Sequence, residues 1–217
     1  TNGTDFIGTT DAQDLDIRTN NVVRTRITQK GQIETLNTGN SVFIGEGAGA
    51  NDDLSNNLNV FVGKDAGASN TTGYANSANG YQALYANDGG YRNAASGAYA
   101  LTANTTGYAN AAFGKDALAI NTTGYRNTAL GAFADVSANN LTNATAIGYN
   151  AEVDASNKIK LGNNNVTSVS TAGALTTGAV TYPNTDGSAY QMLITDGGGA
   201  PYWGNNGMYY TAAGNVG

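Results

Sequence analysis

The chain has 217 residues, of which only 12% are charged, and it contains 30 glycines, 2 prolines and neither cysteine nor histidine. The 16 acidic residues outnumber 10 scattered basic ones, which argues against a nucleic-acid or anionic-lipid partner. The lack of His and Cys excludes the commonest general base, a thiol nucleophile and the usual zinc ligand sets. Large aliphatic side chains are few, so we expect no thick globular core.

No targeting signal is evident in this sequence. No apolar run approaches the roughly 18 residues that span a bilayer, and the first stretch, TNGTDFIGTT, lacks the positive start and apolar centre of a signal peptide. The chain does not begin with Met, which fits a mature or excised fragment, so the sequence does not decide export. The lack of Cys suits a surface or extracellular protein and a cytosolic one equally.

Residues 1–39 predict a small antiparallel β-meander. Apolar and polar side chains alternate in the expected strands, and Asn-Asn and Lys-Gly pairs supply the turns between them. In chain order we expect a strand at 14–18, a turn at 20–21, a strand at 22–28, a turn at 30–31 and a strand at 32–36.

Residues 40–162 form a repeat domain. A Gly followed by Ala at the third position after it recurs with a regular 17-residue spacing, and only the first step is one position longer. An apolar residue stands two positions before each Gly, and five successive copies carry Asn four positions before it. The repeat glycines are Gly45, Gly63, Gly80, Gly97, Gly114, Gly131 and Gly148.

A 17-residue unit favours an all-β solenoid. It is shorter than the two-helix repeats, whose periods begin at about 33 residues, and its frequent glycines disfavour helices. We therefore expect a parallel β-roll of about seven coils, each with two short strands joined by Gly/Asn turns and stacked about 4.8 Å from the next.

Stacking would place equivalent residues of successive coils on top of one another. The Ala three positions after each Gly then marks a place where only a methyl group fits, and the Asn column either forms an amide ladder or holds left-handed turns. We interpret both columns as structural, because a binding site rarely needs the same residue in every coil.

One face of the roll is expected to need a partner. The residues directly before the repeat glycines should face away from the buried column, and most of them are apolar. A thin coil that is apolar on both faces of one strand favours packing against copies of itself, which predicts a homo-oligomer. These residues are Ile44, Val62, Asn79, Ser96, Phe113, Leu130 and Ile147.

Residues 163–217 predict a connector and a β-hairpin. The connector is rich in Thr, Val and Gly and is expected to form short strands around the same axis. In the hairpin, residues 192–194 precede an Asp-Gly turn, and Tyr202-Trp203 follow it as an aromatic pair.

The stretches NSVFIGEGAG, NTALGAFA, NATAIGYNAEV and SNKIKLGN resemble the head repeats of trimeric autotransporter adhesins. The likeness covers about residues 40–162 and departs from that family in its 17-residue spacing, which is longer than the usual coil. The resemblance implies a left-handed parallel β-roll that associates as a threefold bundle.

The two flanks resemble segments of phage-type tail-fibre proteins of the Bacteroidetes group. The similar stretches are DFIGTTDAQDLDIRTNNVVRTRITQKGQIETL and GALTTGAVTYPNTDGSAYQMLITDGGGAPYW. Such fibres often end in a self-cleaving chaperone domain that this chain does not contain, which fits a processed product. The resemblance implies a virion tail, injection-machine fibre or bacterial surface, an anchor outside this chain, and a cell-surface glycan or protein receptor.

Carboxylates are the remaining candidates for catalysis. Asp14/Asp16 and Asp52-Asp53 lie closest in sequence, while Asp65 and Asp116 each follow a Lys at the same repeat position. We interpret them as solvated turns or surface ion pairs, because they do not cluster in one or two coils. A glycan-degrading tailspike with two carboxylates on neighbouring coils is the alternative.

Calcium binding and glycosylation are not favoured by the motifs present. The glycines at 89–90 and 197–199 lack the periodic Asp of calcium-binding β-rolls, so we expect no metal and no cofactor. Asn70, Asn104 and Asn121 begin Asn-Thr-Thr sequons, which we interpret as a recurring turn.

Tyrosines are the best candidates for a contact surface. Tyr74, Tyr91, Tyr108 and Tyr125 form a column that packs at an intersubunit seam or offers a sugar-stacking platform, and the seam is favoured. Four less regular tyrosines are the candidate receptor or glycan contacts: Tyr81, Tyr85, Tyr99 and Tyr149. The prediction is a non-enzymatic, adhesive homotrimeric fibre segment.

Overall fold

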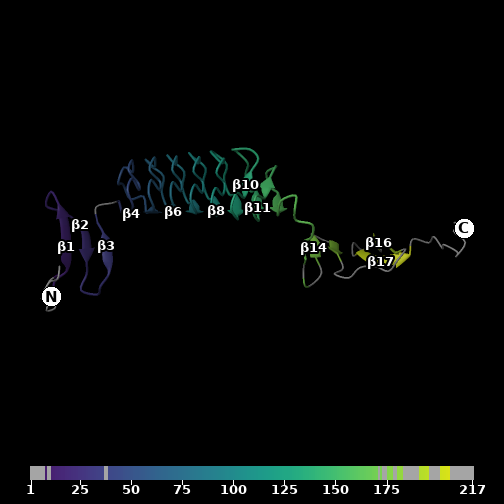
Figure 1. Ribbon diagram of the computed structural model, residues 1–217, viewed down its shortest axis with the longest axis horizontal. Coiled ribbons are helices and arrows are strands. Elements are labelled where there is room, and N and C mark those ends of the chain that lie inside the picture. Colours follow the sequence, from purple (N-terminus) through teal and green to yellow (C-terminus); the bar gives the residue numbers. More distant parts are fainter. Residues whose placement is uncertain are drawn as a thin grey trace, which may run out of the picture. The chain divides into compact units, whose positions relative to one another are not determined.

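The computed structural model describes residues 8, 11–36, 39–170, 172, 175–177, 180–182, 191–195 and 201–205. All regular secondary structure in these residues is β-strand, from β1 to β17 (Figure 1). The chain divides into two compact units, Thr1–Val166 and Thr167–Gly217.

The predicted N-terminal meander is confirmed. Strands β1 (Leu15–Thr19), β2 (Val22–Ile27) and β3 (Ile33–Thr35) form an antiparallel sheet in the order β1-β2-β3. Asn20 and Asn21 both have left-handed φ values, 49° and 58°, as a tight hairpin turn requires.

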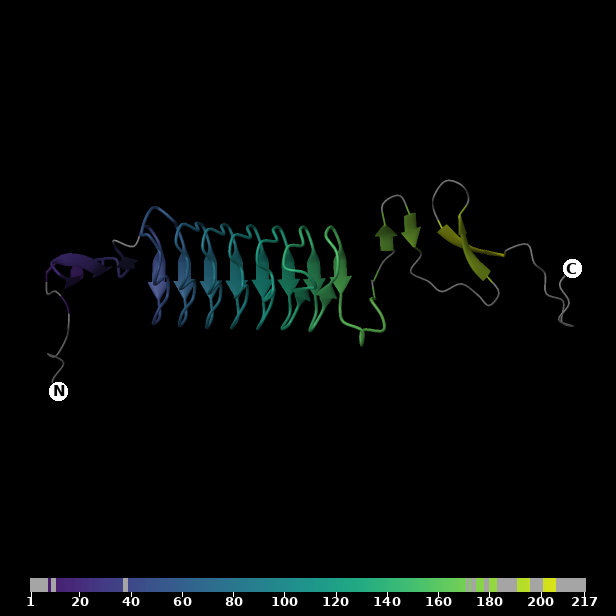
Figure 2. The ribbon, with the colours of Figure 1, turned by 90° about the horizontal axis from the view of Figure 1, so that it is seen from above.

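The repeat domain is a parallel β-solenoid, as predicted. Figure 2 shows its strands side by side along the solenoid, all pointing the same way. Its eight-stranded sheet runs β13-β11-β9-β8-β7-β6-β5-β4. The bounds are β4 Val42–Ile44, β5 Val60–Val62, β6 Ser77–Asn79, β7 Ala94–Ser96, β8 Ala111–Phe113, β9 Thr128–Leu130, β11 Thr145–Ile147 and β13 Ile159–Leu161.

The register of this sheet follows the sequence period. Ala95 pairs with Ala112 and Ala112 with Ala129, so one period of the sequence places equivalent side chains directly beside each other. The last step is shorter, because Ala146 of β11 pairs with Lys160 of β13, before a full period has elapsed. The repeat therefore ends with a truncated coil.

The expected second strand of each coil is found only near the end of the described solenoid. Strands β10 (Asp135–Val136) and β12 (Glu152–Val153) pair in parallel. In three earlier coils the equivalent position, the fourth after the repeat Gly, is a buried Leu with a left-handed φ of 49° to 53°. These leucines are Leu84, Leu101 and Leu118.

The core is filled by pairs of large and small side chains. Phe61 is fully buried, and a Cβ atom on Gly67 would collide with its ring. Three coils further, Ala112 stands in place of the Phe and Leu118 in place of that Gly, and both are fully buried. Each coil therefore keeps its core filled by exchanging volume between two positions of the repeat.

The Ala column predicted three positions after the repeat Gly is buried, as expected. From Ala66 to Ala151 none of its members has any exposed surface, and Ala48 of the first coil is partly buried. The repeat position requires glycine because the backbones of neighbouring coils approach closely there. At Gly97, φ is 141° and a Cβ would overlap the carbonyl of Gly114 in the next coil.

The Asn column predicted from the repeat forms an amide ladder. Each Oδ1 accepts the backbone N–H of the corresponding residue in the next coil at 2.9–3.0 Å, and each Nδ2 donates to a backbone carbonyl of the next coil at 2.7–2.9 Å. None of these residues has a positive φ, so the left-handed-turn alternative does not apply. The column is Asn59, Asn76, Asn93, Asn110 and Asn127.

A second Asn ladder runs beside the first. Each Nδ2 donates to the Oδ1 of the preceding coil at 2.7–3.0 Å. Its members are Asn70, Asn87, Asn104 and Asn121, all fully buried. Asp52 ends both ladders at the first coil, because its Oδ2 accepts hydrogen bonds from Asn59 at 3.1 Å and Asn70 at 2.9 Å.

The second unit contains two antiparallel pairs. β14 (Leu175–Thr177) pairs with β15 (Val180–Tyr182), and β16 (Gln191–Thr195) pairs with β17 (Pro201–Asn205). The predicted hairpin strands are therefore present, whereas the Asp-Gly turn between them and the side chains of Tyr202 and Trp203 lie outside the described residues.

Candidate functional site

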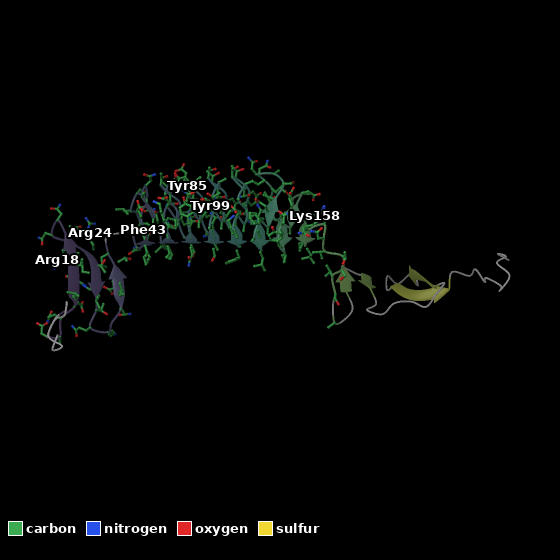
Figure 3. All side chains as sticks on the ribbon, in the orientation of Figure 1. Arg18, Arg24, Phe43, Tyr85, Tyr99 and Lys158 are labelled. Atoms are coloured by element: carbon green, nitrogen blue, oxygen red, sulfur yellow. The ribbon has the colours of Figure 1, made fainter. Side chains whose placement is uncertain are left out.

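The outer face of the eight-stranded sheet carries an exposed apolar stripe. As expected, the residues directly before the repeat glycines point away from the core, and side chains project from this face (Figure 3). Ile44 is 55% exposed and Leu130 is 51% exposed, so neighbouring strands of the sheet do not cover them. Asn79 and Ser96 interrupt the stripe in the middle coils. We refer to this surface as the sheet face.

The tyrosine column is a continuous ring stack. Consecutive ring centroids lie 4.7–4.9 Å apart, and the planes differ by 3° to 4°. Each inner ring is therefore covered on both faces by its neighbours, so the column Tyr74, Tyr91, Tyr108 and Tyr125 offers edges and hydroxyl groups instead of stacking platforms. Arg92 and Arg126 flank it, with each guanidinium 5.8 Å from a ring centroid.

The four candidate contact tyrosines lie outside the ring stack and do not form one site. Tyr81 and Tyr99 pack edge to face at 5.1 Å, and Tyr85 is 40% exposed on the coil of Tyr81 (Figure 3 labels Tyr85 and Tyr99). The pKa of the Tyr81 hydroxyl is raised by its hydrogen bond with Tyr99. Tyr149 lies three coils from Tyr99, is 66% exposed and packs instead against Phe133.

The carboxylates singled out in the sequence have structural partners. Asp16 bonds Arg26 at 2.7 Å and Arg18 at 3.0 Å, and these bonds lower the pKa of Asp16. Lys115 and Asp116 form a 2.8 Å ion pair, and Lys64 lies 3.6 Å from the Asp65 carboxylate. They are separate surface pairs, as expected.

Asp52 and Asp53 differ in their surroundings. Asp52 is buried at the end of the Asn ladders and accepts hydrogen bonds through both oxygens. Asp53 is exposed, and its pKa is lowered by the Ser55 N–H, the Ser55 hydroxyl and the Asn57 amide. The two side chains organise the turn of the first coil and are bridged by Asn57, whose Nδ2 donates to Oδ1 of Asp52 at 3.2 Å and of Asp53 at 2.9 Å.

One further carboxylate pair was not predicted from the sequence. Asp135 of β10 and Glu152 of β12 are direct partners on neighbouring coils. Burial raises the pKa of Asp135 to about 6, against hydrogen bonds from the backbone N–H groups of Val136 and Ile120 that lower it. Both residues line a groove of about 340 Å³. The available signal was that these two acids replace the Leu found at the fourth position after the repeat Gly.

The sequons at Asn70, Asn104 and Asn121 are not accessible in the folded chain. Their side chains are fully buried, and each Nδ2 donates hydrogen bonds inside the second Asn ladder. A glycan on Nδ2 would remove those bonds and require the coil to open. The interpretation of these motifs as recurring turns is consistent with their position.

The described residues contain neither a cluster of metal ligands nor a membrane-spanning helix. No group of three or more Asp, Glu, His or Cys side chains there is arranged to hold a metal ion. No helix in the same residues is long and apolar enough to cross a membrane. In comparisons with known proteins, no family model and no curated protein sequence matches this chain.

Proposed function

We propose that this chain is a structural and adhesive segment of a homotrimeric fibre. The solenoid is the observation that carries the proposal: it repeats one backbone plan along a single axis and carries exposed apolar side chains along one sheet. A structure of this kind spaces and displays surfaces without needing a catalytic centre. The likeness of the repeats to trimeric adhesin heads and of the flanks to tail-fibre proteins supports the same function.

The occupant of the sheet face is a second and third copy of the same chain. The apolar side chains of this face recur at the strand spacing, about 4.8 Å, on both sides of the two middle coils that carry Asn79 and Ser96. A partner that buries all of them must repeat with the same period, which another copy of this solenoid does. Leu130 and Phe113, exposed by 51% and 44%, would then lose water contact in the assembly.

The receptor surface lies on the aromatic residues that the stack leaves open. Tyr81 and Tyr99 present one edge-to-face pair, and Tyr85 is exposed on the coil of Tyr81. Such rings offer both a flat apolar face and a hydroxyl, which suits a cell-surface glycan or protein. The segment would act outside the cell, on a virion tail, an injection-machine fibre or a bacterial surface.

Sedimentation of the intact chain and one matched pair of variants tests the assembly. Leu130→Glu places a charge in the sheet face and should shift the trimer to monomer at micromolar concentration. Thr123→Glu adds the same charge at an exposed site outside the sheet and should leave the trimer intact. Equal behaviour of the two variants would overturn this use of the sheet face.

A glycan-degrading enzyme is the second candidate, because Asp135 and Glu152 adjoin on neighbouring coils and the pKa of Asp135 is raised. That pattern suits an acid and a base or nucleophile. Incubation with host polysaccharide decides between the candidates: new reducing ends that disappear in Glu152→Gln establish the enzyme, while binding without cleavage supports the fibre.

A further inference from the structure

Two hollows adjoin on the last coils of the solenoid. The first, of about 340 Å³, includes Ile120, Phe133 and Asp135 among its lining residues. The second, of about 220 Å³, includes Lys160 and Asn164. Asn150 and Glu152 line both of them, so the two hollows make one groove that crosses successive coils. We refer to it as the terminal groove.

The terminal groove exists because the repeat changes at this point. In the three preceding coils the fourth position after the repeat Gly is a left-handed Leu that points into the core, such as Leu118. At Asp135 the chain is extended instead, and the core is filled by the next residue, Val136, which is 1% exposed. The same exchange at Glu152 and Val153 turns a second carboxylate outward.

The acidic charge of the terminal groove is partly offset by neighbouring cations and hydrogen bonds. Lys160 lines the groove together with Glu152, and Asp116 is paired with Lys115 at 2.8 Å. Asp135 has hydrogen bonds from Val136 at 2.8 Å and Ile120 at 3.3 Å, so its carboxylate is largely engaged with the backbone. The remaining polar lining consists mainly of asparagine amides, which donate and accept hydrogen bonds.

One side of the groove is apolar. Ile120 is 45% exposed and Phe133 is 39% exposed, and the Phe133 ring is contacted by the Lys115 ammonium at 4.7 Å and by the Tyr149 ring at 5.8 Å. A strip of apolar surface beside amides, a carboxylate and an ammonium group fits a ligand with many hydroxyl groups and a ring face of C–H bonds. That description is of a saccharide.

We infer that the terminal groove binds a neutral oligosaccharide, with Asn150, Glu152 and Lys160 bonding its hydroxyl groups and Ile120 and Phe133 contacting its ring faces. The inference rests on the proposed adhesive function and adds a second ligand-binding site to the fibre, apart from the exposed tyrosines. The groove crosses successive coils, so it suits a chain of several sugar units better than a single one.

A basic peptide is the competing ligand, because Asp116, Asp135 and Glu152 all line the groove. The two nearby cations disfavour it, since Lys160 lines the groove and the Lys115 ammonium lies 2.8 Å from the Asp116 carboxylate and 4.7 Å from the Phe133 ring centroid, where both would repel a cationic ligand. Salt separates the two ligands: peptide binding should weaken by an order of magnitude or more from about 50 to about 500 mM NaCl, while neutral saccharide binding should change little.

Titration of the intact chain with maltohexaose, cellohexaose, chitohexaose and a hexalysine peptide tests the inference. We expect at least one hexasaccharide to bind in the micromolar to millimolar range, with amide NMR shifts confined to residues around Asn150 and Glu152. Glu152→Ala should weaken that binding at least tenfold. Glu46→Ala removes another highly exposed carboxylate, outside the groove, and should leave it unchanged.

Each other outcome contradicts the inference. Binding of hexalysine alone would make the groove a peptide site, and saccharide binding lost equally in Glu152→Ala and Glu46→Ala would place the sugar elsewhere. Saccharide-induced amide shifts around Tyr81 and Tyr99 would support the proposed adhesive function but would show that the terminal groove is not its binding site. If no saccharide shifts any resonance while the fibre still adheres to cells, the groove inference alone fails.

Discussion

At the scale of single residues, the solenoid is held by exchanges and substitutions that only the three-dimensional packing explains. Phe61 and Gly67 fill the same space that Ala112 and Leu118 fill three coils away. Asp52 replaces an asparagine at the end of two ladders, where an acceptor is needed and no further amide follows. Each case gives a direct test.

The volume exchange predicts a rescue. Phe61→Ala should lower the free energy of unfolding by about 3–5 kcal/mol, because it empties a fully buried site. Adding Gly67→Leu should recover more than half of that loss, since Leu84 occupies the equivalent position with a φ of 53°. Gly67→Leu alone should be strongly destabilising. Urea denaturation of the four proteins measures the coupling, and additive effects would contradict the exchange.

The end of the Asn ladders predicts a contrast between two neighbouring acids. Asp52→Asn replaces an acceptor with an N–H₂ group that faces the donors of Asn57, Asn59 or Asn70, and should cost on the order of 2–3 kcal/mol. Asp53→Asn keeps the Oδ1 that accepts from Ser55 and Asn57 and should cost less than about 1 kcal/mol. Thermal unfolding compares the two, and an equal loss would refute the role of Asp52.

At the scale of elements, the period of the sequence was sufficient to predict the parallel register of the strands and the buried columns of side chains. A constant step fixes which strands pair, because stacking requires only that equivalent positions coincide. The period could not reveal β10 and β12. Whether the fourth residue after Gly is a left-handed Leu or an extended acid depends on which of two residues fills the core, and both patterns have the same spacing.

The same limit applies to the candidate site. The four irregular tyrosines could be singled out because they depart from the column, but their edge-to-face partners depend on how side chains of neighbouring coils meet. Asp135 and Glu152 stand one repeat apart and belong to no motif, so only the stacking of coils brings them together. Three of the four residues in the second Asn ladder, all but Asn87, also match a glycosylation sequon, and the sequence alone shows no sign of the hydrogen bonds that join them.

The raised pKa of Asp135 predicts a pH dependence for β10. In the folded chain the Asp135 carboxyl has a pKa of about 6, whereas in the unfolded chain its pKa is near 3.8. Between these pH values the folded state therefore binds more protons than the unfolded state. This residue therefore contributes stability below about pH 4 that is lost as the pH rises to about 6. Urea denaturation gives the free energy of unfolding of the wild type and of Asp135→Asn at each pH. Between about pH 4 and pH 6, the wild type should lose about 1–3 kcal/mol of stability relative to the variant.

The comparison with Asp135→Asn removes the contribution of other acids. Asp16 and Asp154 have lowered pKa values, which make stability rise with pH in the acidic range, but they are the same in both proteins. A difference between wild type and variant that is constant from about pH 4 to pH 7 would show that Asp135 is not desolvated in the folded coil.

At the scale of the whole molecule, the central claim is that three copies pack through the sheet face. Ile44, Phe113, Leu130 and Ile147 are each more than a third exposed, although they lie on the same strands as a fully or partly buried column. Burial of one such side chain contributes about 1.5–3 kcal/mol, so repetition along three chains would make assembly strongly favourable.

An electron cryomicroscopy density map of the intact assembly tests this claim most directly. The account predicts a threefold axis along the solenoid, with the strands that carry Ile44 and Leu130 turned towards that axis and Tyr81 and Tyr99 turned towards solvent. A map that shows single solenoids, or a bundle whose sheet faces point outward into solvent, would contradict it.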